Sequence, residues 1–185
     1  DDFLLTDVRK QKMTIYIGIQ PNKLAEARLI INLFFSQLIN LNTKELPQSN
    51  KELRYQCLLL MDEFTSIGAV DIIAKSVSYI AGYNIRLFPI IQSLAQLDSV
   101  YGKEVSRTMV TNHALQILYT PREQQDAADY SEMLGYTSVK KSNVTKGREK
   151  SVSIGDERRA LMLPQELKAM PEDKEIFVYE GLSHP

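Results

Sequence analysis

Two adjacent carboxylates, Asp62 and Glu63, follow directly on an apolar run in the stretch LLLMDEFTSIG, which spans Leu58 to Gly68. The apolar run predicts a strand buried in a sheet. A hard cation such as Mg²⁺ prefers carboxylate oxygens, and a positioned carboxylate can take a proton from an attacking water. The pattern therefore favours ligand chemistry where the strand ends. The alternative is a solvated strand end without such a role.

A second polar site follows the next predicted strand. The stretch LFPIIQSLAQL puts Gln92 at the end of a strand predicted over residues 84–92. Ligands of parallel α/β sheets bind beyond the carboxyl ends of the strands. If the two strands are neighbours, the Gln92 amide lies beside the acids and can hydrogen-bond a γ-phosphate or the attacking water. The alternative is a helix-start glutamine that bonds only backbone.

Four apolar residues followed by Asp-Glu fit the Walker B pattern of P-loop ATPases. In that pattern Asp62 helps hold Mg²⁺ through water and Glu63 is the catalytic base. Such an ATPase also needs a phosphate-binding loop of the form G-x-x-x-x-G-K-[ST]. The eight glycines of the 185 residues include no such spacing. Either the ATPase interpretation is wrong or the loop lies upstream of residue 1.

The elements that must position these residues alternate along the chain. Strands are predicted over residues 13–19, 55–61, 84–92, 113–120 and 175–181, and helices over residues 23–39, 69–83, 94–102 and 121–135. This alternation predicts one α/β domain over residues 1–185, with a mostly parallel sheet flanked by helices. Residues 13–19 read as a strand buried on both faces, and residues 136–156 as an exposed basic hairpin or mobile loop.

Composition narrows the classes of protein. The net charge of -1 gives no global basic field for nucleic acid or anionic membranes. The single cysteine, Cys57, excludes an intrachain disulfide and a cysteine-based zinc site, and its apolar surroundings predict a buried thiol. No apolar stretch reaches the roughly 18–20 residues expected of a membrane helix.

Three stretches together resemble the type IV secretion coupling proteins, the TraG-like conjugative ATPases: LLLMDEFTSIG, YIAGYNIRLFPIIQSLAQLDSVYG and RRALMLPQELKAMPEDKEIFVYEG. The resemblance implies the C-terminal part of a RecA-like P-loop ATPase core, with the phosphate-binding loop and membrane helices upstream. It implies ATP and Mg²⁺ as cofactors of the full-length protein and a homo-oligomeric ring. It further implies DNA–relaxase complexes or secreted effector proteins as cargo, other secretion-system components as partners, and a place at the cytoplasmic face of the bacterial inner membrane.

The resemblance also implies residue roles. Asp62 matches the Walker B aspartate, Glu63 the catalytic glutamate and Gln92 the polar sensor. Some family members carry a basic residue after Walker B that acts on a neighbouring subunit. This chain has Ala81 and Gly82 in that turn, so Arg86 is the nearest candidate, with a strand-start surface charge as its alternative.

Other charged residues leave alternatives open. The stretch KKSNVTKGREK over residues 140–150 has five basic residues against one acid, and contact with DNA or cargo and a plain solvated loop are both open. Arg158 and Arg159 read as a solvated pair or as contacts to nucleotide or a neighbouring subunit. His113 and His184 are too isolated to indicate a metal.

Three functions remain open from the sequence. The first is a fragment of a motor ATPase that couples cargo to a type IV secretion channel and that does not hydrolyse ATP alone. The second is a nucleotide-independent α/β module that binds cargo. The third is a fragment of another DNA translocase of the FtsK/HerA type.

Overall fold

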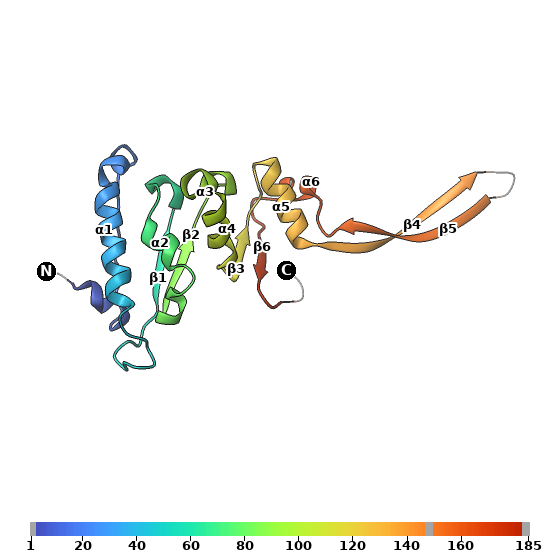
Figure 1. The fold of residues 1–185 in the computed structure, drawn as a ribbon. Helices are drawn as coiled ribbons and strands as arrows, with labels where there is room; N and C mark the ends of the chain where they lie inside the picture. Colours follow the sequence, from blue (N-terminus) through green and yellow to red (C-terminus); the bar gives the residue numbers. More distant parts are fainter. Residues whose placement is uncertain (1–2, 147–149, 183–185) are drawn as a thin grey trace. The chain divides into compact units, whose positions relative to one another are not determined.

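The computed structural model describes residues 3–146 and 150–182, with only the backbone for residues 142–146 and 150–154. The chain divides into two compact units, Asp1–His113 and Ala114–Pro185. Figure 1 shows the elements of each. The assignment of all 185 residues to one domain stays a prediction.

The N-terminal unit is a small parallel sheet with helices packed against it. Its helices are η1 (Leu5–Arg9), η2 (Pro21–Lys23), α1 (Leu24–Asn42), η3 (Phe64–Ile67), α2 (Asp71–Ser76), η4 (Ile80–Tyr83), α3 (Leu94–Tyr101) and α4 (Lys103–Thr111), where η marks a 3-10 helix. Its strands β1 (Cys57–Met61) and β2 (Ile85–Pro89) run parallel, with Cys57 opposite Ile85 and Met61 opposite Pro89. The two predicted strands that carry the polar sites are therefore neighbours, with their carboxyl ends at one edge.

One face of this sheet forms the core of the unit. Cys57, Leu59 and Met61 alternate into the core, and Ile85 of β2 is fully buried there. Leu58 and Leu60 point away and are 57% and 58% exposed. The apolar run predicted a buried strand, and in the described part of the chain β1 is buried on one face only.

A buried arginine ties the ends of several elements together. Arg9 is 2% exposed and donates to Asn42 Oδ1 at the end of α1 (3.4 Å), to the Tyr83 carbonyl oxygen (2.7 Å) and to the Glu45 carbonyl oxygen (3.2 Å). Burial lowers the pKa of Arg9 from its ordinary value. A cation at a helix C-terminus is favourable, because the last carbonyl groups carry partial negative charge.

Residues 13–19, predicted as a strand, are not part of a sheet in the structure. Met13 and Ile15 pack against the core, but Tyr16 is 90% exposed and Ile17 50% exposed. A β-strand requires a hydrogen-bonded neighbour, and no other described segment pairs with these residues. The apolar, β-branched composition alone could not supply that neighbour.

The C-terminal unit contains two antiparallel strand pairs and two helices. Its elements are β3 (Leu115–Leu118), α5 (Gln124–Leu134), β4 (Tyr136–Lys146), β5 (Lys150–Ala160), α6 (Pro164–Lys168) and β6 (Ile176–Tyr179). β3 pairs with β6, and β4 pairs with β5. The α/β class holds, but the mostly parallel sheet does not, since two of the three described sheets are antiparallel.

The β4–β5 ribbon occupies most of the segment predicted to be an exposed hairpin or loop. Its ladder runs from the Tyr136–Ala160 pair to the Lys146–Lys150 pair. The described side chains on it, at residues 136–141 and 155–160, are exposed or half-buried and never buried.

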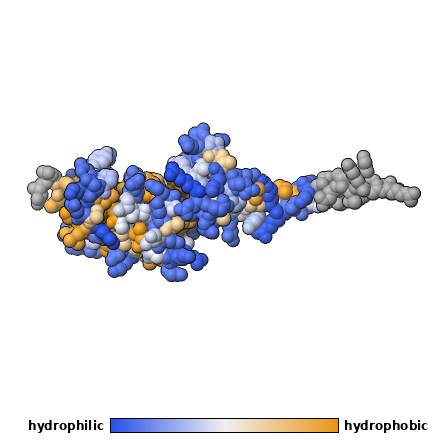
Figure 2. Space-filling view, turned by 90° about the horizontal axis from the view of Figure 1, so that it is seen from above, coloured by the Kyte–Doolittle hydropathy of each residue, from blue (hydrophilic) through white to orange (hydrophobic). Residues whose placement is uncertain are grey.

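Hydrophobic surface is visible on the N-terminal unit among hydrophilic side chains (Figure 2). Leu29, Ile30 and Leu33 of α1 are 58–79% exposed, whereas Leu38 and Ile39 of the same helix are buried in the core. Contrary to the sequence expectation, the 22-residue span Pro21–Asn42 is long and apolar enough to cross a membrane by length and composition. Core helices of globular proteins pass the same test, and α1 contributes to a core.

Candidate functional site

The turn after β1 holds both carboxylates in an unusual backbone conformation. Glu63 has φ 48° and ψ 47°, in the left-handed region. That region costs a residue other than glycine about 1–2 kcal/mol. Asp62 Oδ1 accepts the Glu63 backbone N–H (3.1 Å), and the Glu63 carbonyl oxygen accepts the Ser66 hydroxyl (2.7 Å). Strain of this kind persists only where surrounding contacts enforce it.

Phe64, the residue after Glu63, makes contacts that enforce the left-handed turn. Phe64 is fully buried, and its backbone N–H donates to the Ile90 carbonyl oxygen just beyond β2 (3.0 Å). The Ile90 N–H in turn donates to the Met61 carbonyl oxygen at the end of β1 (2.9 Å). These bonds join the carboxyl ends of the two strands. Burying a phenylalanine side chain contributes about 1.5–3 kcal/mol, enough to offset the cost at Glu63.

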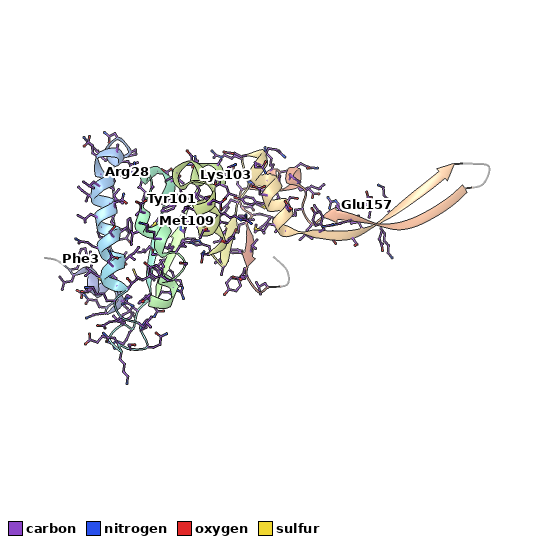
Figure 3. The ribbon with its side chains drawn as sticks, in the orientation of Figure 1. Phe3, Arg28, Tyr101, Lys103, Met109 and Glu157 are labelled. Carbon is purple, nitrogen blue, oxygen red and sulfur yellow. The ribbon has the colours of Figure 1, made fainter. Side chains whose placement is uncertain are left out.

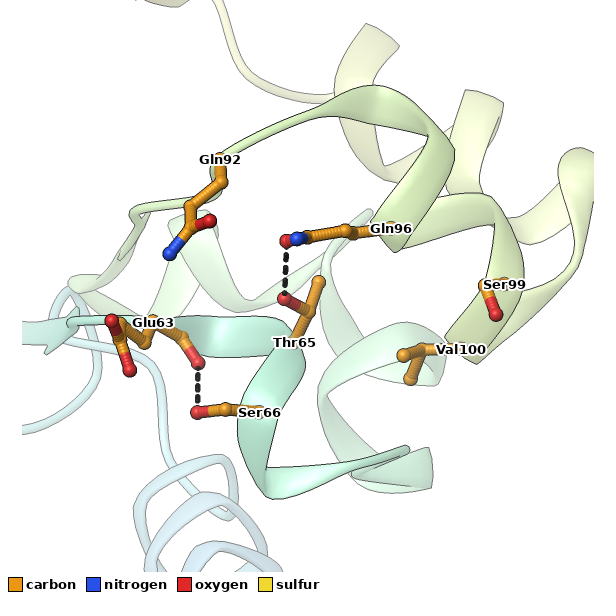
Figure 4. Close-up of a pocket in the computed structure, with 7 residues that line it drawn as sticks. All are labelled: Glu63, Thr65, Ser66, Gln92, Gln96, Ser99 and Val100. Atoms are coloured by element: carbon orange, nitrogen blue, oxygen red, sulfur yellow. Dashed lines mark hydrogen bonds between the residues drawn. The ribbon is translucent and has the colours of Figure 1, made fainter. Parts of the chain in front are cut away.

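A pocket of about 300 Å³, lined mainly by residues with polar side chains, lies at this edge of the sheet (Figure 4). The residues that line it come from the turn after β1 and from the segment that leads into and along α3: Glu63, Thr65, Ser66, Gln92, Gln96, Ser99 and Val100. The structure thus brings together Glu63 and Gln92, which are 29 positions apart in the sequence. A carboxylate and an amide that line one pocket can act on the same water, which the amide orients and from which the carboxylate accepts a proton.

Asp62 and Arg86 do not line the pocket with Glu63 and Gln92. Asp62 precedes Glu63 at the strand end but does not line the pocket. Arg86 pairs with Leu58 near the start of β2, and its Nη1 donates to the Ala81 carbonyl oxygen (2.7 Å). Arg86 is four residues before Ile90, or roughly 13 Å along an extended strand. Within one chain it therefore lies toward the opposite end of the sheet from the pocket.

The carboxylate of Asp62 suits a magnesium ion held mainly by water and phosphate oxygens. Mg²⁺ keeps several of its waters and takes only one or two carboxylates in such sites. Within residues 3–146 and 150–182, no group of three or more histidine, cysteine, aspartate or glutamate side chains forms a metal cage. A single carboxylate such as that of Asp62 is the kind of ligand that a water-mediated magnesium ion uses.

Five pocket residues were not singled out from the sequence: Thr65, Ser66, Gln96, Ser99 and Val100. Gln96 is the third residue of α3, and Gln92 lies just before this helix. Ser93 caps this helix, with its Oγ accepting the Gln96 N–H (3.2 Å). Because Gln92 lies before the helix, the spacing of the two glutamines was no signal of a shared helix face, and only the fold shows that both line the pocket.

Several other sequence candidates have structural partners. Arg158 lies over the Tyr136 ring, 3.7 Å from its centroid, and Arg159 forms an ion pair with Glu166. Nδ1 of His113 lies 2.7 Å from the Met109 carbonyl oxygen. His184 is outside the described residues. The basic stretch 140–150 is described only in part, and its Lys141 pairs with Glu157 (2.8 Å).

Cys57 is buried in β1, as predicted, and its thiol is inert by position. Desolvation raises the pKa of Cys57, and the nearby Arg9 opposes that shift. A buried thiol that is reluctant to ionise is a poor nucleophile.

Comparison with known proteins identifies the family. Residues 1–184 match the family described as Type IV secretory system Conjugative DNA transfer. The chain belongs to this family. Coupling proteins of type IV secretion and conjugation are therefore its relatives, as the resemblance in the sequence indicated.

Two curated relatives show how much of such a protein the chain represents. Protein VirD4 of Agrobacterium fabrum is 27% identical over 188 residues, which covers 100% of this chain and 28% of the relative. Conjugal transfer protein TraG of Escherichia coli is 28% identical over 177 residues, with 88% and 28% coverage. The chain spans little more than a quarter of the length of these coupling-protein relatives.

Solved structures of the plasmid coupling protein TrwB share the fold. The unbound monoclinic form of the bacterial conjugative coupling protein TrwBdeltaN70 superposes with a TM-score of 0.78 at 17% identity, covering 100% of this chain and 42% of that one. TrwB in complex with ADP and Mg²⁺ gives a TM-score of 0.74 at 19% identity with the same coverage. The α/β fold of this chain is thus the fold of part of a coupling protein.

Proposed function

We propose that this chain is the C-terminal portion of a RecA-like nucleotide-binding domain in a coupling ATPase of type IV secretion. The observation that carries the proposal is the pocket that Glu63 and Gln92 both line, at the carboxyl ends of two parallel strands. Such strand ends are where open α/β sheets bind ligands. Family membership and a TrwB structure in complex with ADP and Mg²⁺ support nucleotide as the ligand.

Each residue has a distinct task in this proposal. Glu63 accepts the proton of the attacking water, and the Gln92 amide orients that water and the phosphate. Asp62 holds the magnesium ion through its waters. When bound, ATP supplies the electrophilic phosphoryl group and Mg²⁺ neutralises its charge. The left-handed turn fixes the backbone from which the Glu63 side chain projects, which reduces the reorganisation needed in the transition state.

The remaining parts of the proposal concern the whole coupling protein. Its phosphate-binding loop and membrane helices precede the segment that corresponds to this chain. It forms a homo-oligomeric ring at the cytoplasmic face of the inner membrane. Arg86 reaches a phosphate only from a neighbouring subunit, since its own pocket lies at the other end of the strand. The ring delivers DNA–relaxase complexes or effector proteins to the secretion channel.

ATP hydrolysis by the full-length product of the gene, measured with and without DNA, tests the proposal. We expect Glu63→Gln to lower kcat by about 10²–10⁴-fold, the usual contribution of a general base, with nucleotide binding retained. Gln92→Ala lowers kcat by a smaller factor. The matched control is Glu26→Gln, because Glu26 is exposed on α1 in an ion pair with Lys23.

Two outcomes would contradict the proposal. Hydrolysis that is unaffected by Glu63→Gln removes Glu63 from the reaction. A full-length product that binds no nucleotide favours the nucleotide-independent cargo module instead. The 185 residues alone are expected to show no Glu63-dependent turnover.

A further inference from the structure

Helix α3 contacts the acid-bearing turn at both of its ends. The turn spans residues 62–70, and α3 begins two residues after Gln92. One contact involves Gln96 in the first part of the helix, and the other involves Tyr101, its last residue. The pocket residue Gln92 and the Glu63 turn are thus linked by a single short helix.

The contact at the end of α3 combines packing and a hydrogen bond. The Tyr101 ring stacks on Phe64, with 5.5 Å between centroids and 13° between planes. The Tyr101 hydroxyl accepts the Val70 backbone N–H (3.1 Å). Burial is the main cause that raises the pKa of Tyr101 to about 12. The hydroxyl therefore stays neutral at physiological pH. Tyr101 holds the turn both just after Glu63 and at its far end.

The contact at the start of α3 lies inside the pocket. The Thr65 hydroxyl donates to Gln96 Oε1 (3.3 Å), as Figure 4 shows. Thr65 is two residues beyond Glu63, and Gln96 is four residues beyond Gln92. This hydrogen bond joins α3 to the turn from which the Glu63 side chain projects.

Helix α1 braces the same turn from another side. Gly68 has φ +74°, and a Cβ built there would lie 3.0 Å from the Arg28 guanidinium. Asn32 Nδ2 donates to the Ala69 carbonyl oxygen (3.3 Å). Arg28 and Tyr101 are labelled in Figure 3. Side chains of both helices thus contact the turn that follows Glu63.

From these contacts we infer that Gln96 and Tyr101 are positioning residues for Glu63. They hold the left-handed turn from which the Glu63 side chain projects, and they join this turn to the helix that follows Gln92. The inference rests on the proposed function, and it adds two residues that act through the turn and take no proton themselves.

The test measures steady-state ATP hydrolysis by the full-length product with variants that remove one polar contact each. Tyr101→Phe keeps the ring and removes the acceptor for Val70. Thr65→Val keeps the side-chain shape and removes the donor to Gln96. We expect each to lower kcat about tenfold with KM for ATP changed less than twofold, and Thr65→Ser to return kcat toward wild type. Tyr16→Phe, at a 90% exposed tyrosine, is the control.

Hydrogen exchange provides the second readout on the same proteins. The Val70 amide exchanges faster in Tyr101→Phe than in the wild type, because it has lost its acceptor. If Tyr101→Phe does not fold, Thr65→Val with Thr65→Ser carries the kinetic test alone.

The outcomes separate this inference from the proposed function. If the wild type shows no Glu63-dependent hydrolysis, the proposed function fails. If Glu63 is required but Tyr101→Phe and Thr65→Val retain wild-type kcat, the positioning role is overturned. A parallel change of kcat and KM also overturns it, since that pattern indicates a general loss of structure.

Discussion

Of the two ladders β1–β2 and β4–β5, the shorter one carries the candidate site and the longer one has no buried side chain in its described part. The short parallel pair β1–β2 has five paired positions on each strand, and it holds the turn and the pocket. The β4–β5 ribbon has eleven paired positions on each strand, yet its described side chains are all exposed or half-buried. Hydrogen-bonded length alone does not fix a site. Burial of one face, with helices contacting the strand ends, positions side chains closely enough for chemistry.

The ribbon is stabilised by a different set of interactions. Lys141 pairs with Glu157 across the strands, and Arg158 lies over Tyr136. Exposed ion pairs contribute about 0–1 kcal/mol, and exposed cation–π contacts about 0.5–1 kcal/mol. The ribbon therefore tolerates side-chain changes that the turn after β1 does not.

Truncating one aromatic in each region is the strongest test of this contrast. Phe64→Ala is expected to lower the free energy of unfolding by about 3–5 kcal/mol, because it leaves a cavity under the acid turn. Tyr136→Ala is expected to cost about 1 kcal/mol or less, since Tyr136 is 53% exposed. Urea unfolding followed by amide hydrogen exchange reads the two units separately. Equal costs would show that the ribbon is packed as firmly as the core.

A smaller effect sharpens the contrast at Glu63 itself. Glu63→Gly and Glu63→Ala both remove the carboxylate, but only glycine adopts the left-handed conformation without cost. Glu63→Gly is expected to be the more stable by about 1 kcal/mol in urea unfolding. At Glu26, which is exposed on α1, the order is reversed. Glu26→Ala is expected to be more stable than Glu26→Gly by about 0.5–1 kcal/mol. If alanine is the better residue at both positions, the turn carries no strain.

The smallest expected effect concerns the base of the ribbon. The Leu163 N–H and Arg159 lower the pKa of Glu166 below its ordinary value of about 4.5. The ionised form therefore stabilises the folded state above pH 4.5, and this stabilisation is lost as pH falls through the lowered pKa. The difference in stability between wild type and Glu166→Gln should shrink on acidification from pH 7 to pH 3. Removing Arg159 should weaken the pH dependence of this stability difference. A stability difference that does not change with pH would contradict the prediction.

Much of the secondary structure could be predicted from local patterns. The helical spacing from Lys23 onward marks α1, and the Pro–Gly bounds of residues 121–135 mark α5. α4 was missed because Gly102 reads as a helix stop. Gly102, with φ +79°, does end α3, but it also begins α4 directly. A turn residue therefore marks the end of one helix but does not predict the next element of the chain.

The sequence by itself determined the site chemistry that we propose for Asp62, Glu63 and Gln92, because residue type and placement after an apolar strand are local properties. Tertiary structure alone decided that β3 and β6, some sixty residues apart, pair antiparallel and that residues 13–19 have no strand partner in the described part. It also decided that Thr65 meets Gln96 and that Phe64 stacks on Tyr101. Contacts between distant segments depend on which faces are buried together, and no local pattern encodes them.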